Sequence, residues 1–304
     1  MATNLPKTMK AAVLDEAGPP EAIHLRSVPV PQLAPGHVII ALDYASVGIW
    51  DAKQRSGAWG AIKPGTIAGA DGSGTVAAVA SDVTRLRLGD RVYSYSYANP
   101  HGGFYAEYIS VSADRVEAVP AQLDQNVAGA MPCVALTAHS GLRALELKRG
   151  QTLLVFGATG GVGSFAVWLA AHACEATVIG TARADAYDYL RALGATPAGD
   201  SLKDFDAILA TANGDTLPAF VSRAKPKAPV AYPNGVEPEP KFDEHPSVPF
   251  DGQMSHDAFE RLNEAIGKRT IPLHIEEFPL DRVVDAHRRI EQGHVEGKIV
   301  LRIR

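Results

Sequence analysis

The chain has 304 residues, of which 46% are hydrophobic and 21% charged, an ordinary composition for a globular protein with room for two domains. Its net charge of −5 argues against nucleic acid as the main partner. No apolar run approaches the roughly 20 residues of a membrane span, so no membrane partner is expected.

Two cysteines, Cys133 and Cys174, are too few for a disulfide framework, and both stand in apolar, helix-like stretches. Residues 1–10 lack the hydrophobic core of a signal peptide. The sequence therefore predicts reduced structural thiols in a cytoplasmic protein.

Residues 8–125 predict an all-β region. Short runs rich in β-forming residues alternate with Gly, Pro and Asp. These runs cover residues 10–14, 37–42, 74–79, 90–94 and 105–111. Their spacing predicts a compact barrel.

A helical stretch over 126–148 leads into the segment 152–183, around which the rest of the chain is organised. This segment reads as a buried strand, a glycine-rich turn over 157–163, an apolar helix and a second strand. A glycine motif in this context predicts a dinucleotide-binding unit.

The turn carries the pattern Ala158-x-Gly160-x-x-Gly163, in which alanine replaces the first glycine of the usual fingerprint. Bare backbone N–H groups and the positive end of a helix attract a pyrophosphate, and side chains there would push it away. The alternative is a turn that only packs the helix on the sheet. The predicted phosphate-binding residues are Ala158, Thr159, Gly160, Gly161, Val162 and Gly163.

The end of the second strand indicates which cofactor is bound. Chains that bind NAD usually carry Asp or Glu there, bonded to the ribose 2′-hydroxyl. Here the residues are Thr181, Ala182 and Arg183. A guanidinium binds a 2′-phosphate and a carboxylate repels it, so NADPH is favoured. The alternative is that Arg183 is a solvated surface arginine.

The α/β alternation continues after this unit. Helices are expected over 186–193, 217–225, 255–268 and 280–292, and strands over 206–210, 228–232 and 298–303. Ser255 is a candidate N-cap. The proline-rich stretch 233–249 is expected to be a surface loop.

Several segments together carry a family resemblance, although none is specific alone. They are Ala68-Gly-Ala-Asp-Gly-Ser-Gly-Thr-Val76, Leu88-Gly-Asp-Arg-Val92, Gly103-Phe-Tyr-Ala-Glu-Tyr108, Leu136-Thr-Ala138, the glycine turn, and Phe278-Pro-Leu280 through His287 to Gly297-Lys-Ile-Val-Leu301. In their order and spacing the chain resembles the zinc-independent medium-chain reductases, most of all the quinone oxidoreductases, from about Lys10 to Ile303.

The resemblance implies a GroES-like β-barrel domain over 1–125, completed by 272–304, and a Rossmann domain with a doubly wound parallel sheet over 126–271. It implies an NADPH-lined cleft between them and a homodimer. Thr137 matches a residue near the nicotinamide, with helix packing as its alternative role. Tyr232 begins a loop that borders the cofactor in the family.

No metal site is expected. The zinc-dependent relatives carry Cys and Gly-His-Glu where this chain has Gly48 and Gly69-Ala70-Asp71. Ala70 cannot ligate a metal, and two cysteines cannot form a four-cysteine zinc lobe.

The chain departs from the quinone oxidoreductases over residues 45–55. Their Asn and Tyr positions appear here as Gly48 and Lys53. The predicted substrate pocket is Ile49, Trp50, Lys53 and Trp59. The tryptophans suit a flat acceptor, or else pack in the core or a lid. Lys53, the one catalytic candidate, suits donation to a substrate oxygen, or else is a solvated lysine.

The predicted activity is NADPH-dependent transfer of hydride to a small-molecule quinone or other conjugated carbonyl, without metal. The sequence names no required acid. Two alternatives stay open. One is an enone or alkenal double-bond reductase without quinone activity. The other is a weakly catalytic NADPH-binding sensor or structural protein, which the missing Asn and Tyr positions suggest.

Overall fold

The computed structural model describes residues 5–97, 99–100, 102–199 and 202–304. Residues 1–4 of the segment expected to lack a signal core lie outside this part. The chain forms two compact units. Unit 1 comprises Met1–Cys133, Met254–Glu260 and Ile275–Arg304, and unit 2 comprises Val134–Gln253 and Arg261–His274.

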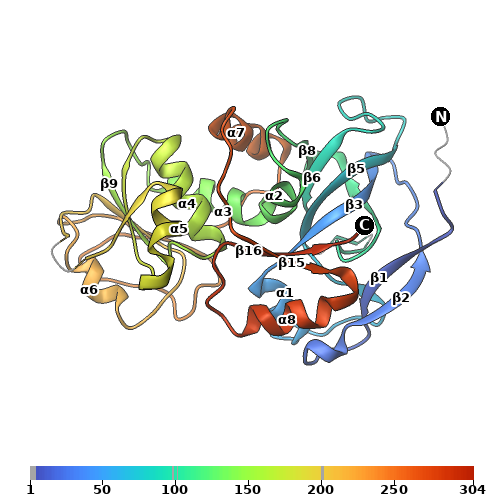
Figure 1. The fold of residues 1–304 in the computed structure, drawn as a ribbon, viewed down its shortest axis with the longest axis horizontal. Coiled ribbons are helices and arrows are strands. Elements are labelled where there is room, and N and C mark those ends of the chain that lie inside the picture. Colours follow the sequence, from blue (N-terminus) through green and yellow to red (C-terminus); the bar gives the residue numbers. More distant parts are fainter. Residues whose placement is uncertain (1–4, 98, 101, 200–201) are drawn as a thin grey trace. The chain divides into compact units, whose positions relative to one another are not determined.

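Unit 1 is built from two sheets, and the chain's tail completes the larger one (Figure 1). The smaller sheet has the order β2 (His24–Pro29), β1 (Thr8–Leu14), β4 (Thr66–Ile67). The larger has the order β15 (Ile275–Pro279), β16 (Lys298–Arg302), β3 (His37–Val47), β5 (Asp71–Val79), β6 (Arg91–Tyr95), β8 (Val116–Ala118), with β7 (Tyr108–Ser112) also paired to β3. Strand β16 runs antiparallel to β3, with Ile299 opposite Val47.

The core of unit 1 lies between these elements. Val38, Ile40 and Leu42 of β3 are fully buried with Ile299 and Leu301 of the tail. Unit 1 also contains η1 (Pro20–Ala22), η2 (Ala113–Arg115), η4 (Leu280–Arg282) and α8 (Val283–Glu291). The GroES-like barrel class predicted from the sequence is confirmed.

The all-β prediction for residues 8–125 is wrong over α1 (Ile49–Arg55). This short helix interrupts the strands directly after β3. The carboxylate of Asp51 accepts a hydrogen bond of 2.8 Å from the Gly48 backbone N–H, which satisfies a donor at the start of the helix. The helix carries three of the four predicted pocket residues, Ile49, Trp50 and Lys53, so their spacing follows a helical period.

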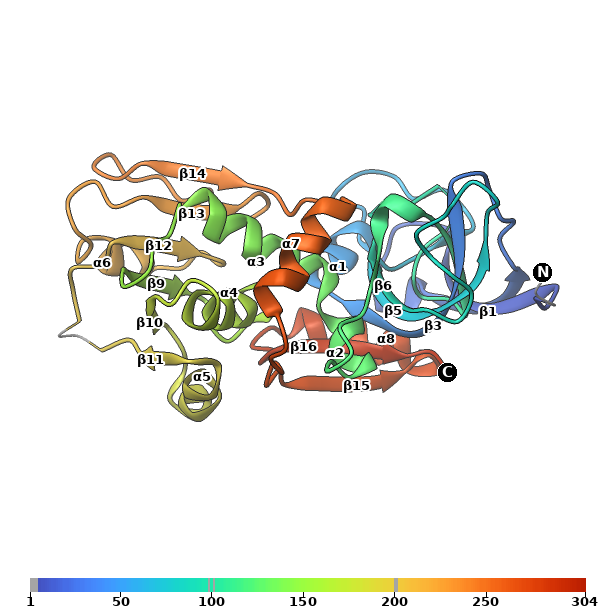
Figure 2. The same cartoon turned by 90° about the horizontal axis from the view of Figure 1, so that it is seen from above.

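Unit 2 contains a six-stranded parallel sheet (Figure 2). Its order is β11 (Ala195–Pro197), β10 (Thr177–Gly180), β9 (Thr152–Phe156), β12 (Ala207–Ala210), β13 (Val230–Pro233), β14 (Ser247–Phe250). The helices of this unit include α3 (Pro132–Ala144), α4 (Gly161–His172), η3 (Ala184–Ala186), α5 (Tyr187–Leu193) and α6 (Leu217–Val221). The predicted doubly wound sheet is confirmed.

The prediction of a surface loop over 233–249 is wrong at both ends, because Pro233 still belongs to β13 and Ser247 begins β14. This strand adds to the sheet edge in parallel with β13, and Val230 lies opposite Ser247. The sequence did not predict this strand, because the segment 246–250 contains two prolines and shows no hydrophobic period. Residues 234–246, which precede this strand, belong to no helix or strand.

The unit boundaries differ from the sequence boundaries at three places, of which the smallest is the start of the tail, at Ile275 in place of residue 272. Unit 1 continues past residue 125 to Cys133, because α2 (Gln125–Ala130) packs on β3 and β5. Residues 254–260 also group with unit 1, and they include the start of α7 (His256–Ile266). There His256 Nδ1 lies 2.6 Å from a carboxylate oxygen of Glu117. The Ser255 hydroxyl accepts from the Ala258 N–H at 3.3 Å, as expected of an N-cap.

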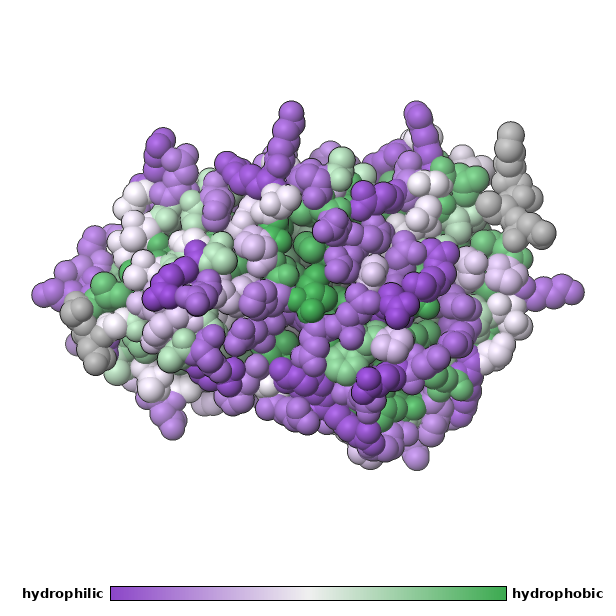
Figure 3. Space-filling view, viewed as in Figure 1, coloured by the Kyte–Doolittle hydropathy of each residue, from purple (hydrophilic) through white to green (hydrophobic). Residues whose placement is uncertain are grey.

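The face drawn in Figure 3 is mostly hydrophilic, with separate apolar patches among the polar side chains. Within the described ranges, no helix has both the length and the apolar character that a membrane crossing requires.

Candidate functional site

The glycine-rich turn lies at the carboxyl end of β9, and α4 begins directly after it. Strand β9 stands between β10 and β12, where the strand order of the sheet reverses. In doubly wound sheets ligands bind at this point, outside the carboxyl ends of the strands. The local sequence therefore places the turn where a dinucleotide is expected.

The structural requirement for glycine differs among positions 157, 160 and 163 of the turn. Gly157 has a φ of +79°, which favours glycine, and its N–H donates to Thr181 Oγ1 at 2.9 Å. A Cβ on Gly163 would lie 2.0 Å from the Gly157 carbonyl oxygen, so this glycine is required by packing. A Cβ on Gly160 would find only that same oxygen, at 3.7 Å. The space beside Gly160 is therefore open to a ligand.

The other residues of the turn complete this surface. Ala158 is buried, whereas Thr159, Gly161 and Val162 are partly exposed around the start of α4. Exposed backbone at a helix N-terminus suits a phosphate.

The end of β10 leads into a partly exposed Thr181 and Ala182 and an exposed Arg183. The Arg183 side chain is 52% exposed, and its Nη2 lies 3.4 Å from Asp185 Oδ2. A long, exposed ion pair is weak. The guanidinium can therefore exchange this partner for a phosphate.

Thr137 and Tyr232 also belong to unit 2. Thr137 lies on α3 and is 9% exposed, and a Cβ on Gly252 would lie 2.6 Å from its hydroxyl oxygen. Tyr232 is near the end of β13, and its hydroxyl donates to the Glu239 carboxylate. The structure places Tyr232 at the same edge of the sheet as the glycine turn, because both follow the carboxyl ends of parallel strands.

The predicted pocket residues of unit 1 lie on and beyond α1. Ile49 and Trp59 are large exposed apolar residues, 49% and 48% exposed, and Lys53 is partly buried. The ring of Trp59 meets Tyr97 edge-on, with centroids 5.8 Å apart. Tyr97 was not among the predicted pocket residues, although the alternation Tyr93-Ser-Tyr95-Ser-Tyr97 indicates one aromatic face of a strand.

Trp50 lies elsewhere. The Lys298 ammonium lies 4.7 Å from the centroid of its indole ring, a cation–π contact. A Cβ on Gly48 would come within 2.3 Å of two ring carbons. Trp50 therefore occupies the space that a side chain at position 48 would need. The structure records Trp59 against Tyr97 and Trp50 against Lys298.

Lys298, the residue that Trp50 contacts, belongs to a buried charged cluster that the sequence did not reveal. Asp51 and Asp71 are 2% and 0% exposed, and Lys298 is 3% exposed. Burial and the neighbouring Asp71 carboxylate raise the pKa of Asp51 to about 7. Burial raises the pKa of Asp71 to about 6, against the opposing effect of Lys298. Burial likewise lowers the pKa of Lys298.

The cluster also involves backbone groups. Lys298 Nζ donates to the Val47 carbonyl at 3.1 Å, and the Cys133 N–H donates to Asp71 Oδ2 at 2.9 Å. Burial raises the pKa of the Cys133 thiol. Cys133 is buried and Cys174 half-buried, and neither forms a disulfide.

Comparison with known proteins gives the family. An alcohol dehydrogenase GroES-like domain matches residues 34–121, and a zinc-binding dehydrogenase domain matches residues 184–301. The chain is 30% identical to an Arabidopsis thaliana chloroplastic NADPH-dependent alkenal/one oxidoreductase, covering 98% of this chain and 80% of that protein. The chain belongs to the medium-chain dehydrogenase/reductase family.

Two further proteins are also similar to the chain. A Solanum lycopersicum 2-methylene-furan-3-one reductase is 30% identical, over 98% of this chain and 80% of that protein. The structure of a quinone oxidoreductase from Coxiella burnetii superposes with a TM-score of 0.86 at 27% identity, covering 98% of this chain and all of that one. The resemblance of this medium-chain reductase to quinone oxidoreductases is confirmed.

One of the two matching domains is described as a zinc-binding dehydrogenase, but the residues of this chain do not fit a zinc ion. Gly48 and Ala70 offer no ligand atom. In the part of the chain that the structure covers, no group of three or more His, Cys, Asp or Glu side chains is arranged to hold a metal ion.

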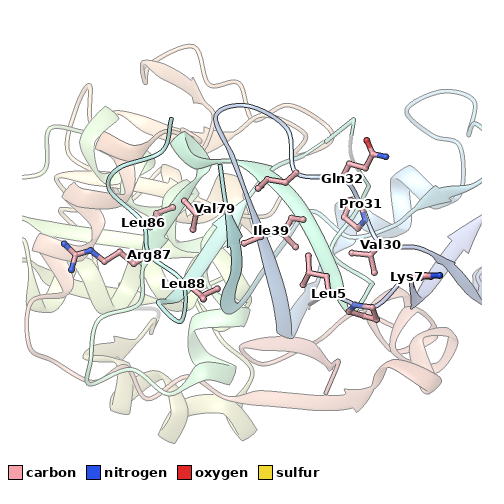
Figure 4. Close-up of a pocket in the computed structure, with 13 residues that line it drawn as sticks. Leu5, Lys7, Val30, Pro31, Gln32, Ile39, Val79, Leu86, Arg87 and Leu88 are labelled. Atoms are coloured by element: carbon pink, nitrogen blue, oxygen red, sulfur yellow. The ribbon is translucent and has the colours of Figure 1, made fainter. Parts of the chain in front are cut away.

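A cavity of about 770 Å³ in unit 1 of this medium-chain reductase contains none of the predicted pocket residues. Figure 4 shows Ile39, Val79, Leu86 and Leu88 gathered at its centre, while the Arg87 side chain extends outward. Most of the side chains that line the cavity are apolar, and Lys7, Gln32 and Arg87 also line it.

Proposed function

We propose that this protein is an NADPH-dependent reductase of conjugated carbonyl compounds, either quinones or enones, and that it acts without metal. The observation that carries the proposal is the open glycine turn beside a strand end that has no acid and leads into Arg183. The names of the relatives support the substrate class, since they include an alkenal/one reductase and a quinone oxidoreductase.

The residues present fit the cofactor. The backbone from Ala158 to Gly163 would hold the pyrophosphate, Arg183 the 2′-phosphate, and Thr137 and Tyr232 would border the rest. When bound, NADPH supplies a hydride to an electron-poor carbon. The chain contributes binding, orientation and exclusion of water. Ile49, Trp50, Lys53 and Trp59 are the proposed acceptor contacts. The homodimer and the cytoplasmic location stay predictions.

A substrate panel tests the proposal directly. NADPH oxidation should be measured with quinones, enones and alkenals, and with saturated ketones as controls. We expect turnover with conjugated acceptors only. Tight NADPH binding without turnover on any acceptor would favour the weakly catalytic sensor, and turnover of enones alone would favour the double-bond reductase.

Arg183 should set the choice of cofactor. We expect NADPH to bind at least about tenfold more tightly than NADH, because a guanidinium–phosphate contact contributes about 1.5–3 kcal/mol. Arg183→Ala should remove this preference in a fluorescence titration of both cofactors. Arg191→Ala, on α5, removes the same charge and should leave the preference for NADPH unchanged. Equal affinities in the parent protein would contradict the assignment.

Activity should not depend on a metal. Dialysis against a strong chelator should leave turnover unchanged, because Gly48 and Ala70 cannot ligate zinc. Elemental analysis of the purified protein should find no stoichiometric zinc. A rate lost to the chelator and restored by zinc would refute this prediction.

Lys53 should assist the reaction as a donor. We expect Lys53→Ala to lower kcat about three- to tenfold with little change in the NADPH dissociation constant, because its ammonium stabilises charge that develops on the acceptor oxygen. Lys63→Ala, an exposed lysine of the same unit, is the matched control. Equal kcat values for parent and Lys53→Ala would leave Lys53 as a solvated lysine.

A further inference from the structure

The cavity of about 770 Å³ in unit 1 is not used by the proposed reaction. Every described residue that lines it belongs to unit 1, and none is among the residues proposed to hold NADPH or the acceptor. Sites for small molecules have volumes of about 300–1,000 Å³, mostly apolar walls and a few polar groups. The cavity has these properties, so it is a candidate for a second ligand site.

The floor of the cavity is formed by one face of the larger sheet. Val38 and Ile40 of β3 belong to the core of unit 1, and Ile39 between them faces the other side of the strand. Ala78 of β5 lies opposite Ile39 in the ladder, and both residues line the cavity. Because alanine is small, the floor beside Ile39 is apolar and recessed.

Three segments form the walls of the cavity. Residues 5–7 lead into β1 and residues 30–33 follow β2. The Val30 N–H donates to the Lys7 carbonyl at 3.2 Å, which holds these two segments together. Residues 86–88, from the connection between β5 and β6, lie on the opposite side (Figure 4).

The cavity is open to solvent and is lined by aliphatic side chains. Leu33 and Leu88 are 38% and 54% exposed, and they stand on opposite walls. Large apolar side chains that remain exposed beside a cavity favour a ligand that covers them. None of the described lining residues is aromatic, so the walls offer no ring on which a flat ligand could stack. An aliphatic chain therefore suits this lining.

The rim of the cavity is basic. Lys7 and Arg87 line it on opposite sides, and no described lining residue is Asp or Glu (Figure 4). The Arg87 N–H donates to Asp90 Oδ2 at 2.7 Å, which fixes the backbone of this residue. Its side chain extends outward at the edge of the apolar surface. A guanidinium offers two parallel donors to a carboxylate, so the rim suits an anionic group.

We propose that this cavity binds a free fatty acid. Its alkyl chain lies over Ile39 and Ala78, between Leu33 and Leu88, and its carboxylate stays at the rim beside Arg87. Burial of the chain supplies most of the affinity, and the partly hydrated ion pair fixes its direction. A saturated fatty acid has no conjugated carbonyl, so it is a ligand of this site and not an acceptor of hydride.

Isothermal titration calorimetry with octanoate, decanoate and laurate, below the concentrations at which they form micelles, tests the site. We expect one molecule per chain and an affinity that rises about two- to fourfold for each added methylene until the cavity is filled. Decylammonium has the same chain as decanoate with the opposite charge. It should bind at least about fivefold more weakly than decanoate.

Leu88→Asn tests the apolar wall without a change of charge. Because Leu88 is 54% exposed, the fold should tolerate asparagine, and we expect laurate to bind at least about fivefold more weakly. Leu33→Asn makes the same change on the opposite wall and should act alike. Leu25→Asn is the matched control, since Leu25 is 39% exposed in unit 1 and does not line the cavity. It should bind laurate as the parent does.

Arg87→Glu tests the rim. We expect it to weaken laurate binding about five- to tenfold, because it replaces an attraction by a repulsion. Lys148→Glu makes the same change of charge at an exposed position of unit 2 and should have no effect. The NADPH dissociation constant and the circular dichroism spectrum should be the same in all these variants.

Two results would overturn the assignment. Equal laurate affinities in the parent, Leu88→Asn and Leu33→Asn would place the fatty acid elsewhere. Heat released only above the micelle concentration would show that the protein binds an aggregate or lipid surface and not a single chain. The titration needs neither turnover nor NADPH, so a parent without reductase activity would refute the proposed function and leave this test intact.

Discussion

Gly160→Val should abolish NADPH binding and leave the protein folded. Gly160 has extended backbone dihedral angles, and a Cβ at this position would have its nearest neighbour 3.7 Å away, so valine fits the fold. Its methyl groups would stand where the pyrophosphate meets the start of α4. Loss of two charge-assisted hydrogen bonds, about 1.5–3 kcal/mol each, corresponds to a weakening of at least about 100-fold. A fluorescence titration measures it.

Gly163→Ala is the matched control for this turn. A single methyl group there would lie 2.0 Å from the Gly157 carbonyl oxygen, so the substitution should lower the melting temperature. Gly160→Val therefore tests cofactor binding, and Gly163→Ala tests the packing of the same turn. A folded Gly160→Val protein that binds NADPH normally would place the phosphate site elsewhere.

Asp51→Asn should stabilise the protein at pH 8 and much less at pH 4. Burial holds the pKa of Asp51 at about 7, well above the value of about 3.9 in an unfolded chain. Between these values the folded protein keeps a proton that the unfolded chain releases, so stability falls as pH rises from about 4 to 7. Asparagine removes this penalty, which is on the order of 4 kcal/mol.

Urea unfolding at pH 4, 6 and 8 measures the effect. Asparagine still offers an oxygen to the Gly48 N–H, so the helix start is preserved. Burial lowers the pKa of His287 to about 3, and this adds stability as pH rises from about 3 to 6.5, in the parent and the variant alike. The groups that face Asp51 are Asp71, Lys298 and Tyr105. Parallel pH curves for parent and variant would show that Asp51 ionises normally.

The glycine unit was predictable because its signals are local. Strand, turn, helix and strand follow one another between Thr152 and Gly180, and each is set by its own residues. The doubly wound order follows from repeating that alternation. Strand β14 was not predictable, because its pairing with β13 and not its composition makes it a strand.

The charged cluster could not be predicted because its members are distant in sequence. Asp51, Asp71 and Lys298 meet only when β16 pairs with β3 and β3 with β5. In the sequence each reads as an ordinary surface charge. The position of Trp50 was hidden for the same reason, since its partner Lys298 comes from the tail.

The contact between Gly48 and Trp50 also constrains how this chain can change over evolution. A ligating side chain at position 48 would collide with the indole, and removing the indole first would uncover the buried Lys298. A ligating residue at position 48 is therefore harmful while Trp50 is present, and loss of Trp50 is harmful while position 48 is glycine. The two positions are epistatic, and at least two coupled changes separate this chain from a metal-binding relative even before Ala70 is considered.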